Sequence, residues 1–592
     1  MNQIINNAKR LFIASIALLA FLPLGGFGWG LGLVGLLSSC SDMLEQDSDL
    51  VRFADKEMLS QPADTLYSVV GIMKKLQALA DRTIVLGELR GDLVDVNNYA
   101  ASDVRDVAMF RISAENRFNR PRDYYAVINN CNYFLAHVDT ALRNNQNQRI
   151  FEKERAVVKA YRAWTYMQLA LIYGRVPLVT EPIVDMHVDE SRYPLYDLQQ
   201  VCQYFITDLA PLADVDLPGY GFIGQVDSRL TYFPIYVLLG ELNLWACNYR
   251  EAALCYYSYI SRRNGTDTAW PAGTLRLEWS RDDGKYERYV DAWTLPAFMQ
   301  ERFTEDSELV TMTPGDSIPT SPNYSSLPSL FCTTIQNDGY YSLLPSRAML
   351  SLSARQVYCN LTSTGEVGYA PTNLAENRSG DLRLSSACHT YNYNIAGLTT
   401  TASRPTAQVL EKYAFSNNVH IWRRAMVYLH MAEALNRAGL PAFAFRILST
   451  GVNNRVVEEM QHEYPADSVW LAQFNFPNTE YVLRTESPTA YTTLGIHSRG
   501  SGFTEYNEFY RMPGGSLQEQ IEAVEDMIVD EEALELAFEG HRFYDLMRVA
   551  LRRNDPAYLA SRIMSRRGVG VDSGIAANLF DTSNWYLPFN SE

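Results

Sequence analysis

Apolar side chains recur every three or four positions over much of the chain, which is the pattern of amphipathic helices packed on one another. Residues 151–173 carry one such stripe, and Gly174 followed by Pro177 marks its end. The same pattern predicts helices in both the N-terminal and the C-terminal parts. Their ranges are 65–79, 122–138, 195–212, 233–246, 250–260, 517–538 and 542–551.

Two of the helical pairs carry a repeat signature. Aromatic and small residues lie at offsets similar to those of tetratricopeptide repeats at Tyr236, Leu239, Gly240, Tyr249, Ala252 and Tyr256. Gly240 and Ala252 would let two helices approach closely while the aromatic rings fill the flanks. A weaker copy spans residues 428–444, and the helix before Gly174 is a candidate for a third. Stacked units of this kind bury a continuous core.

The helical pattern breaks in two regions. At about 262–410, and again at about 461–515, Gly, Pro, Ser, Thr and Asn become frequent and short alternating runs replace the apolar stripes. The sequence therefore predicts a mainly α fold, in which a scaffold of tetratricopeptide-like helical pairs carries large irregular insertions. Segments carried on a rigid scaffold often supply binding residues.

An uncharged apolar run precedes the helices. Lys9 and Arg10 are followed by residues 11–37, which carry no charge, and then by two serines, Cys40 and an acidic stretch. A basic start, an apolar centre and small residues at the cut are typical of an export signal. The cysteine resembles the lipidation site of bacterial lipoproteins, so we expect cleavage before Cys40 and lipid on Cys40. A transmembrane anchor is the alternative, since the run is long enough to span a bilayer.

These patterns define the organisation of the chain. We expect a signal peptide (1–39), a lipidated N-terminus and tether (40–60), a helical scaffold (61–261), an irregular insertion as the candidate ligand-binding region (262–410), a helical pair (411–460), a second irregular insertion (461–515), and C-terminal helices with a tail (516–592). A hydrophobic fraction of 47% fits a globular body with a core. The net charge of −17 disfavours nucleic acid as a partner.

The cysteines other than Cys40 are widely and irregularly spaced, and their number is odd, so at least one stays unpaired. Those in helix-like apolar stretches are expected to be small core residues: Cys131, Cys202, Cys247 and Cys255. A disulfide between Cys359 and Cys388 is compatible with an oxidising compartment, but the spacing does not decide it.

The sequence holds few motifs of catalysis or cofactor binding. Zinc-protease, nucleophile-elbow, P-loop and dinucleotide signatures are absent from it, and we expect no cofactor and no metal. His430 and Glu433 form a His-x-x-Glu pattern, but no second histidine is expected to face them. This favours a histidine at the edge of the core over a metal ligand.

The segment 531–548 combines acids, a histidine and arginines. Glu539 and Arg542 are three residues apart, as are Asp545 and Arg548, so each pair is expected to join on a helix face. We interpret these pairs as structural rather than catalytic. A pair of glycosidase carboxylates stays open as an alternative, because the acids are numerous and none stands out.

Five segments, in this order, resemble the SusD/RagB family of outer-membrane nutrient-binding lipoproteins: 122–132, 162–179, 428–439, 539–548 and 585–588. The resemblance implies a non-enzymatic, surface-exposed protein that captures a glycan, or a peptide. It implies delivery of that ligand to a SusC-like TonB-dependent transporter, which lies against the helical scaffold. The lipid on Cys40 would hold the protein at the outer membrane.

The matched motifs belong to the scaffold, so the ligand contacts are predicted from the residues themselves. Exposed aromatic faces beside amide groups suit glycans and peptides. The candidates are Asn97, Asn98, Tyr99, Trp270, Trp279, Trp293 and Tyr324. The alternative for each tryptophan is that it packs its insertion onto the scaffold. Two other functions stay open, a secreted hydrolase and a repeat scaffold that binds only protein.

Overall fold

The structure is a computed structural model. It describes residues 62–184, 192–223, 226–263, 279–282, 285–288, 308–318, 320–321, 324–332, 341–361, 364–370, 380–392, 406–414, 416–476, 495–568 and 573–589. The chain divides into two compact units, Met1–Met58 and Leu59–Glu592, and everything described lies in the second. The predicted signal peptide and Cys40 lie outside the described residues. Within those residues, no helix combines the length and apolarity that crossing a membrane requires.

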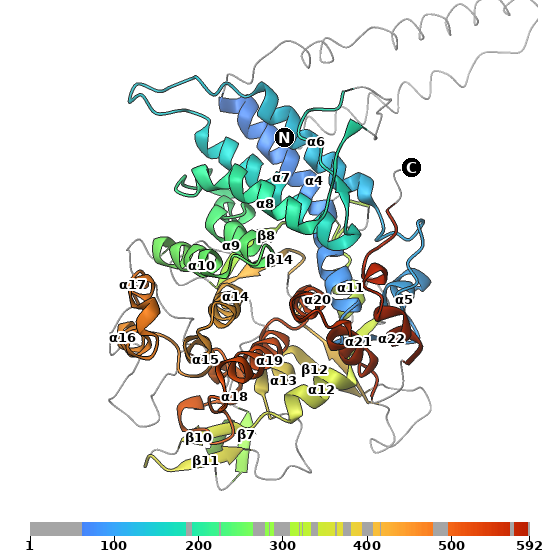
Figure 1. Ribbon diagram of the computed structural model, residues 1–592. Coiled ribbons are helices and arrows are strands. Elements are labelled where there is room, and N and C mark those ends of the chain that lie inside the picture. Colours follow the sequence, from blue (N-terminus) through green and yellow to red (C-terminus); the bar gives the residue numbers. More distant parts are fainter. Residues whose placement is uncertain are drawn as a thin grey trace, which may run out of the picture. The chain divides into compact units, whose positions relative to one another are not determined.

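Helices dominate the second unit, which confirms the predicted mainly α fold (Figure 1). In the N-terminal half they are α4 (Pro62–Leu89), α5 (Ser102–Ala108), α6 (Pro121–His137), α7 (Glu152–Tyr173), α8 (Leu198–Leu209), α9 (Ile235–Trp245) and α10 (Tyr249–Arg263). In the C-terminal half they are α14 (Arg424–Arg437), α15 (Pro441–Ser449), α16 (Asn454–Glu463), α17 (Ser468–Leu471), α18 (Ser498–Ser501), α19 (Leu517–Glu535), α20 (Arg542–Arg553), α21 (Pro556–Met564) and α22 (Ser573–Leu579).

Each predicted long helix is present, and the largest difference is at the first. The pattern predicted 65–79, whereas α4 continues to Leu89. The apolar stripe is interrupted by Asp81 and Arg82, but both find partners on other elements: Asp81 accepts from Ser325 and Ser326, and Arg82 pairs with Asp123. Charged residues with tertiary partners can therefore extend a helix that periodicity alone would end.

The helical pairs pack as the repeat signature predicts. Helix α9 packs on α10, α14 packs on α15, and α10 packs on α14, so the two pairs are stacked. A Cβ atom built on Gly240 would lie 2.4 Å from Cε1 of Tyr256, far inside normal contact distance. Gly240 is therefore required for the close approach of α9 and α10. Gly174 ends α7 with a φ of +77°, also as predicted.

We expect Gly240→Ala to lower the free energy of unfolding by about 1–3 kcal/mol, because the added methyl group must push the Tyr256 ring or the helix away. Urea denaturation measures the change. Gly71→Ala is the matched control, since Gly71 is exposed on α4 with nothing within 4 Å of its Cβ position. That variant should be neutral or slightly stabilised, as alanine favours helix over glycine. Equal effects of the two substitutions would contradict the packing role.

The described strands are short and pair two by two in antiparallel ladders. The pairs are β1 (Val94–Val96) with β9 (Leu343–Pro345), β2 (Val176–Pro177) with β3 (Leu195–Tyr196), β4 (Phe222–Ile223) with β5 (Val226–Asp227), β6 (Trp279–Asp282) with β7 (Lys285–Arg288), β8 (Leu309–Thr313) with β14 (Val419–Arg423), β10 (Tyr358–Leu361) with β11 (Val367–Ala370), and β12 (Cys388–Asn392) with β13 (Thr406–Leu410). Three short helices lie among them: α11 (Leu327–Phe331), α12 (Arg347–Ala354) and α13 (Leu382–Ala387).

The cysteines follow the prediction only in part. Cys131 and Cys202 are buried and Cys255 is half-buried, but Cys247 is exposed, so the prediction for Cys247 was wrong. Cys247 follows the end of α9 with a φ of +62°, in the turn rather than on the packed face. Cys359 and Cys388 both carry free thiols, and they lie in different ladders, on β10 and β12.

Candidate functional site

The predicted ligand residues Asn97, Asn98 and Tyr99 lie in a turn that is fixed at its base. Strand β1 leads into the turn and pairs with β9, and the side-chain amide of Asn97 donates to the carbonyl oxygen of Tyr341 at 2.6 Å. The N–H of Tyr99 donates to Oδ1 of Asn97 at 2.9 Å. On the other side, Arg105 donates to the carbonyl oxygen of Asn98 at 2.6 Å.

The ring of Tyr99 projects from this turn into solvent. The residue is 64% exposed, which is high for a large aromatic side chain. Because the backbone on both sides is hydrogen-bonded, the ring is presented from a defined position. A preorganised aromatic face of this kind loses little entropy when a ligand stacks on it.

Tyr324 lies in a second segment that is anchored in the same region. Tyr324 is half-buried, and its backbone forms a β-bridge with that of Asp316. The segment continues into α11, where the carbonyl oxygen of Leu330 accepts from the N–H of Ser342 at 2.9 Å. Ser342 also accepts from the N–H of Asn97 at 3.0 Å. The Tyr99 turn and the Tyr324 segment are thus both tied to the stretch before β9.

The remaining candidates are placed only in part. Trp270 and Trp293 lie outside the described residues, and the described part of Trp279 is its backbone, at the start of β6. Three exposed rings were not predicted, because nothing in their sequence surroundings distinguishes them from packing aromatics: Phe222, Phe509 and Phe580.

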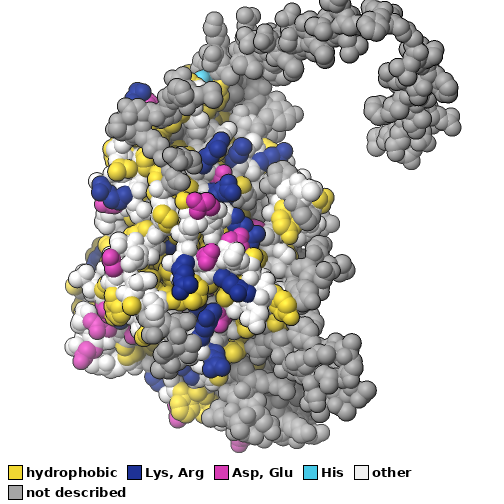
Figure 2. All heavy atoms as spheres, turned by 90° about the vertical axis from the view of Figure 1, so that its right-hand side faces the viewer, with side chains coloured by type: hydrophobic (Ala, Val, Ile, Leu, Met, Phe, Trp, Pro, Cys, Tyr) yellow, Lys and Arg dark blue, Asp and Glu magenta, His cyan; other side chains and the backbone are white. Residues whose placement is uncertain are grey.

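The face that bears α5, α11 and α22 turns toward the viewer in Figure 2. Lys and Arg side chains stand out on this face, although the whole chain carries a net charge of −17. On α5 and in the loop after it, the exposed residues include Arg105, Arg111, Arg117 and Arg120, and Arg117 is paired with Asp103 at 2.6 Å. The surface that follows Tyr99 in the chain is therefore less acidic than the protein as a whole.

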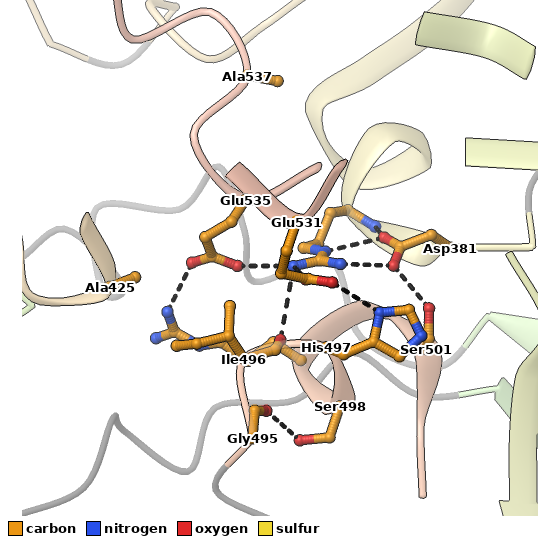
Figure 3. A network of polar contacts seen from close by, with 12 residues as sticks. Asp381, Ala425, Gly495, Ile496, His497, Ser498, Ser501, Glu531, Glu535 and Ala537 are labelled. Carbon is orange, nitrogen blue, oxygen red and sulfur yellow. Dashed lines mark hydrogen bonds and ion pairs between the residues drawn. The ribbon is translucent and has the colours of Figure 1, made fainter. Parts of the chain in front are cut away.

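A buried ion network joins the insertions to the C-terminal helices. It consists of Glu308, Asp381, Arg383, Lys412, Arg423, His497, Arg499, Glu531, Glu535 and Glu539. Arg383 contacts Asp381 at 2.8 Å and Glu535 at 2.9 Å. Figure 3 shows Asp381, Glu531 and Glu535 directed toward one centre, with His497 and Ser501 beside them.

The buried ion network serves structure rather than acid–base chemistry. Burial would raise the pKa of Glu539, but Arg423 and Lys412 outweigh it and lower that pKa to about 2. At Glu308, burial likewise raises the pKa, but Arg499 and Arg423 outweigh it and lower the pKa to about 2. A general acid needs a pKa near the working pH, so these ionised, paired carboxylates are unsuited to that task.

Within 531–548, one of the two predicted pairs is confirmed. Arg548 contacts Asp545 at 2.9 Å, three residues away on α20. The Glu539–Arg542 prediction was wrong, because Glu539 binds Arg423 at 2.7 Å and Arg542 binds Asp92. Gly540 explains the difference: its φ of +89° breaks the backbone between the two residues, so they do not share a helix face.

His430 is fully buried, in agreement with a core position, and its Nδ1 lies 2.6 Å from Oε1 of Glu241. The expectation that no second histidine lies nearby was wrong, since the His541 ring centroid is 6.3 Å from that of His430. The cavity beside them also holds Glu241, Glu539 and Asp545, but its volume is only about 40 Å³. A sugar ring does not fit there, so these carboxylates do not form a glycosidase cleft.

A larger cleft of about 370 Å³, not predicted from the sequence, lies at the end of α7. Arg175, Asp197, Trp245 and Tyr586 contribute to its walls. The cleft brings together the residue after Gly174, the start of α8, the end of α9 and the C-terminal tail. Only the fold assembles it, so no local pattern could have revealed it.

Comparison with known proteins agrees with the fold. Residues 502–588 match the sequence model of the SusD family. A SusD superfamily protein from Bacteroides thetaiotaomicron is 16% identical over 88% of this chain and 97% of its own, with a TM-score of 0.52. One from Bacteroides vulgatus is 16% identical over 89% of this chain and 95% of its own, with a TM-score of 0.53.

A third solved structure, surface glycan-binding protein A from Bacteroides fluxus, is 13% identical over 87% of this chain and 94% of its own, with a TM-score of 0.53. No curated protein matches the chain. At these identities the structures establish a common fold, and the C-terminal segment adds the match to the family itself. Residues 502–588 therefore match the SusD family, and the chain shares the fold of SusD superfamily proteins.

Proposed function

We propose that the protein is a nutrient-binding lipoprotein of the outer membrane, which captures a glycan at the cell surface and delivers it to a SusC-like TonB-dependent transporter. Lipid on Cys40 would hold it at the membrane, and the helical scaffold would contact the transporter. The match of residues 502–588 to the SusD family supports this role, as does the shared fold with a surface glycan-binding protein. The observation that carries the proposal is the exposed ring of Tyr99 on its fixed turn.

We propose different roles for the residues of this turn. Both ends of the Asn97 side-chain amide are engaged, the nitrogen with Tyr341 and the oxygen with Tyr99, so Asn97 positions the turn. Tyr99 then offers its face to the apolar side of a sugar ring, and Asn98 offers an amide to the hydroxyl groups. Tyr324, Trp270, Trp279 and Trp293 are proposed to extend this surface.

We also propose that the protein binds without turnover. The carboxylates of the buried ion network are paired with arginines, and the cavity that holds Glu241, Glu539 and Asp545 is too small for a sugar. Release of product from a bound glycan by the purified protein would overturn this part of the proposal.

We expect Tyr99→Ala to weaken glycan binding about tenfold or more, because it removes the stacking face, and Tyr99→Trp to preserve binding. A glycan array identifies the ligand, and isothermal titration calorimetry of wild type and variants measures the loss. Phe580→Ala removes another exposed ring, 55% exposed, and is the matched control with unchanged affinity.

Arg175→Ala tests the competing location, since Arg175 is an exposed wall residue of the 370 Å³ cleft. Binding that survives Tyr99→Ala but is lost in Arg175→Ala would move the site to the cleft. A ligand that proves to be a peptide rather than a glycan would correct the ligand class while leaving the Tyr99 surface as the place of binding.

A further inference from the structure

Three helices bring one histidine and two carboxyl groups to a single buried point. His430 on α14, Glu532 on α19 and Asp545 on α20 are each at most 2% exposed. One donor atom from each lies within 4.8 Å of the other two. Nε2 of His430 is 3.8 Å from Oδ1 of Asp545. The three donors come from helices far apart in the sequence, so tertiary packing sets their spacing.

The imidazole of His430 is oriented for ligation. Its Nδ1 faces Oε1 of Glu241 at 2.6 Å, and Glu241 accepts in turn from the hydroxyl of Tyr256 at 2.7 Å. When a carboxylate accepts the Nδ1 proton, the lone pair stays on Nε2, and metal-binding histidines commonly have such a partner. Nε2 of His430 has no hydrogen-bond partner among the described residues.

Of the three side chains, Glu532 has the fewest hydrogen bonds among the described residues. Both carboxyl oxygens are buried and neither has a hydrogen-bond partner among the described residues. Nη2 of Arg548 is 3.7 Å from Oε1, and it already binds Glu433 at 2.6 Å and Asp545 at 2.9 Å. Buried polar groups are normally paired, because leaving one unpaired costs free energy. A buried carboxyl group without a hydrogen bond, beside an imidazole nitrogen that also has none, points to a site for a cation.

The charges around this point leave room for a cation. The carboxyl groups that surround it are Glu241, Glu433, Glu532 and Asp545. The arginines that contact them are Arg548 and Arg437. Arg437 is also shared with Glu525 at 3.0 Å. These four carboxyl groups thus outnumber the two arginines that contact them, which favours a further cation among them.

We propose that His430, Glu532 and Asp545 bind a divalent transition-metal ion, with Zn²⁺ as the preferred occupant. Imidazole nitrogen and carboxylate oxygens suit Zn²⁺. Ligand atoms about 2.0–2.1 Å from a tetrahedral ion are about 3.3 Å apart, so the donors need to close by a modest amount. The ion would cross-link α14, α19 and α20 inside the scaffold, which is independent of ligand capture at Tyr99.

The surroundings leave space for a fourth ligand and offer an entry path. The cavity of about 40 Å³ is lined by His430, His541 and Asp545, which leaves space for a water molecule, and the His541 ring stands beside it. Trp245 and Arg548 belong to the walls of both this cavity and the 370 Å³ cleft. An ion could therefore reach the site from the cleft by a small movement of these two side chains.

The test strips the mature protein with a chelator and adds back Zn²⁺. We expect uptake of about one ion per chain, measured by elemental analysis after dialysis, and a rise in Tm of several degrees. Glu532→Gln keeps the shape of the side chain and removes the ligand charge, so it should abolish both effects. Without metal its Tm should equal or exceed that of the stripped wild type, since glutamine carries no charge for burial to penalise.

Glu88→Gln is the matched control, because Glu88 is another fully buried glutamate, on α4, and it is not one of the proposed ligands. This variant should still take up Zn²⁺. His430→Gln should lose uptake, and circular dichroism checks that it remains folded. A stripped wild type that takes up no Zn²⁺, or uptake that persists in both Glu532→Gln and His430→Gln, would overturn the proposal.

Discussion

Arg423→Ala is expected to lower the free energy of unfolding by about 3–5 kcal/mol, the range for breaking a buried ion pair by removing one partner. The side chain of Arg423 is 2% exposed and contacts Glu535 at 2.7 Å, Glu539 at 2.7 Å and Glu308 at 3.1 Å. Alanine would leave these carboxylates buried with less positive charge nearby. Because Arg423 ends β14 and its partners lie on other elements, the loss should loosen the junction between insertion and scaffold.

Urea denaturation followed by circular dichroism measures this loss. Arg355→Ala is the control, because Arg355 forms an exposed pair with Asp530 at 2.5 Å, with side-chain exposures of 59% and 33%. Exposed pairs contribute about 0–1 kcal/mol, so this variant should lie close to wild type. Arg423→Lys should fall in between, since lysine keeps the charge but cannot engage three carboxylates with a planar fork. A loss at Arg423 no larger than that at Arg355 would show that the buried ion network does not stabilise the fold.

The sequence predicts the helical part of this fold well, because the information is local. The apolar stripe of 151–173, the stop at Gly174 and the small residue at Gly240 each act on near neighbours along the chain. Periodicity and turn chemistry report such features directly. The position of Tyr99 next to a turn is local too, and the structure shows that its ring is exposed.

Contacts across long sequence distances could not be predicted in the same way. Glu308 and Arg499 are 191 residues apart, and Asn97 and Tyr341 are 244 apart. Each charged residue has many oppositely charged residues elsewhere in the chain, and the tertiary structure determines which of them lies within contact distance. The i,i+3 rule therefore assigned Glu539 to Arg542, whereas a single glycine with positive φ redirected Glu539 to Arg423. For the same reason, the sequence did not reveal that the ring of His541 lies near that of His430.

We expect the wild-type protein to lose stability as the pH rises from about 4.5 to 7, and we expect Glu88→Gln to abolish this loss. Glu88 is fully buried on α4, where Oε1 accepts from the N–H of Gly540 at 2.8 Å. Burial outweighs this hydrogen bond and raises the pKa of Glu88 from 4.5 to about 7. Below pH 4.5 the carboxyl group is protonated in both states and the site has no pH-dependent cost.

Above pH 4.5 the unfolded chain releases this proton while the folded chain keeps it until about pH 7, so stability falls across that window and then levels off. The size is about 3 kcal/mol for a shift of this order, and glutamine, which cannot ionise, avoids it. Unfolding free energies at pH 4.5 and pH 8 should therefore show Glu88→Gln gaining on wild type. Exposed Glu519 should show the opposite pH dependence. Hydrogen bonds from Ser516 lower its pKa, so the stability of Glu519→Gln should fall relative to that of wild type as the pH rises. Parallel pH profiles of wild type and Glu88→Gln would show that Glu88 is ionised in the folded protein at neutral pH, and that the N–H of Gly540 compensates for its burial.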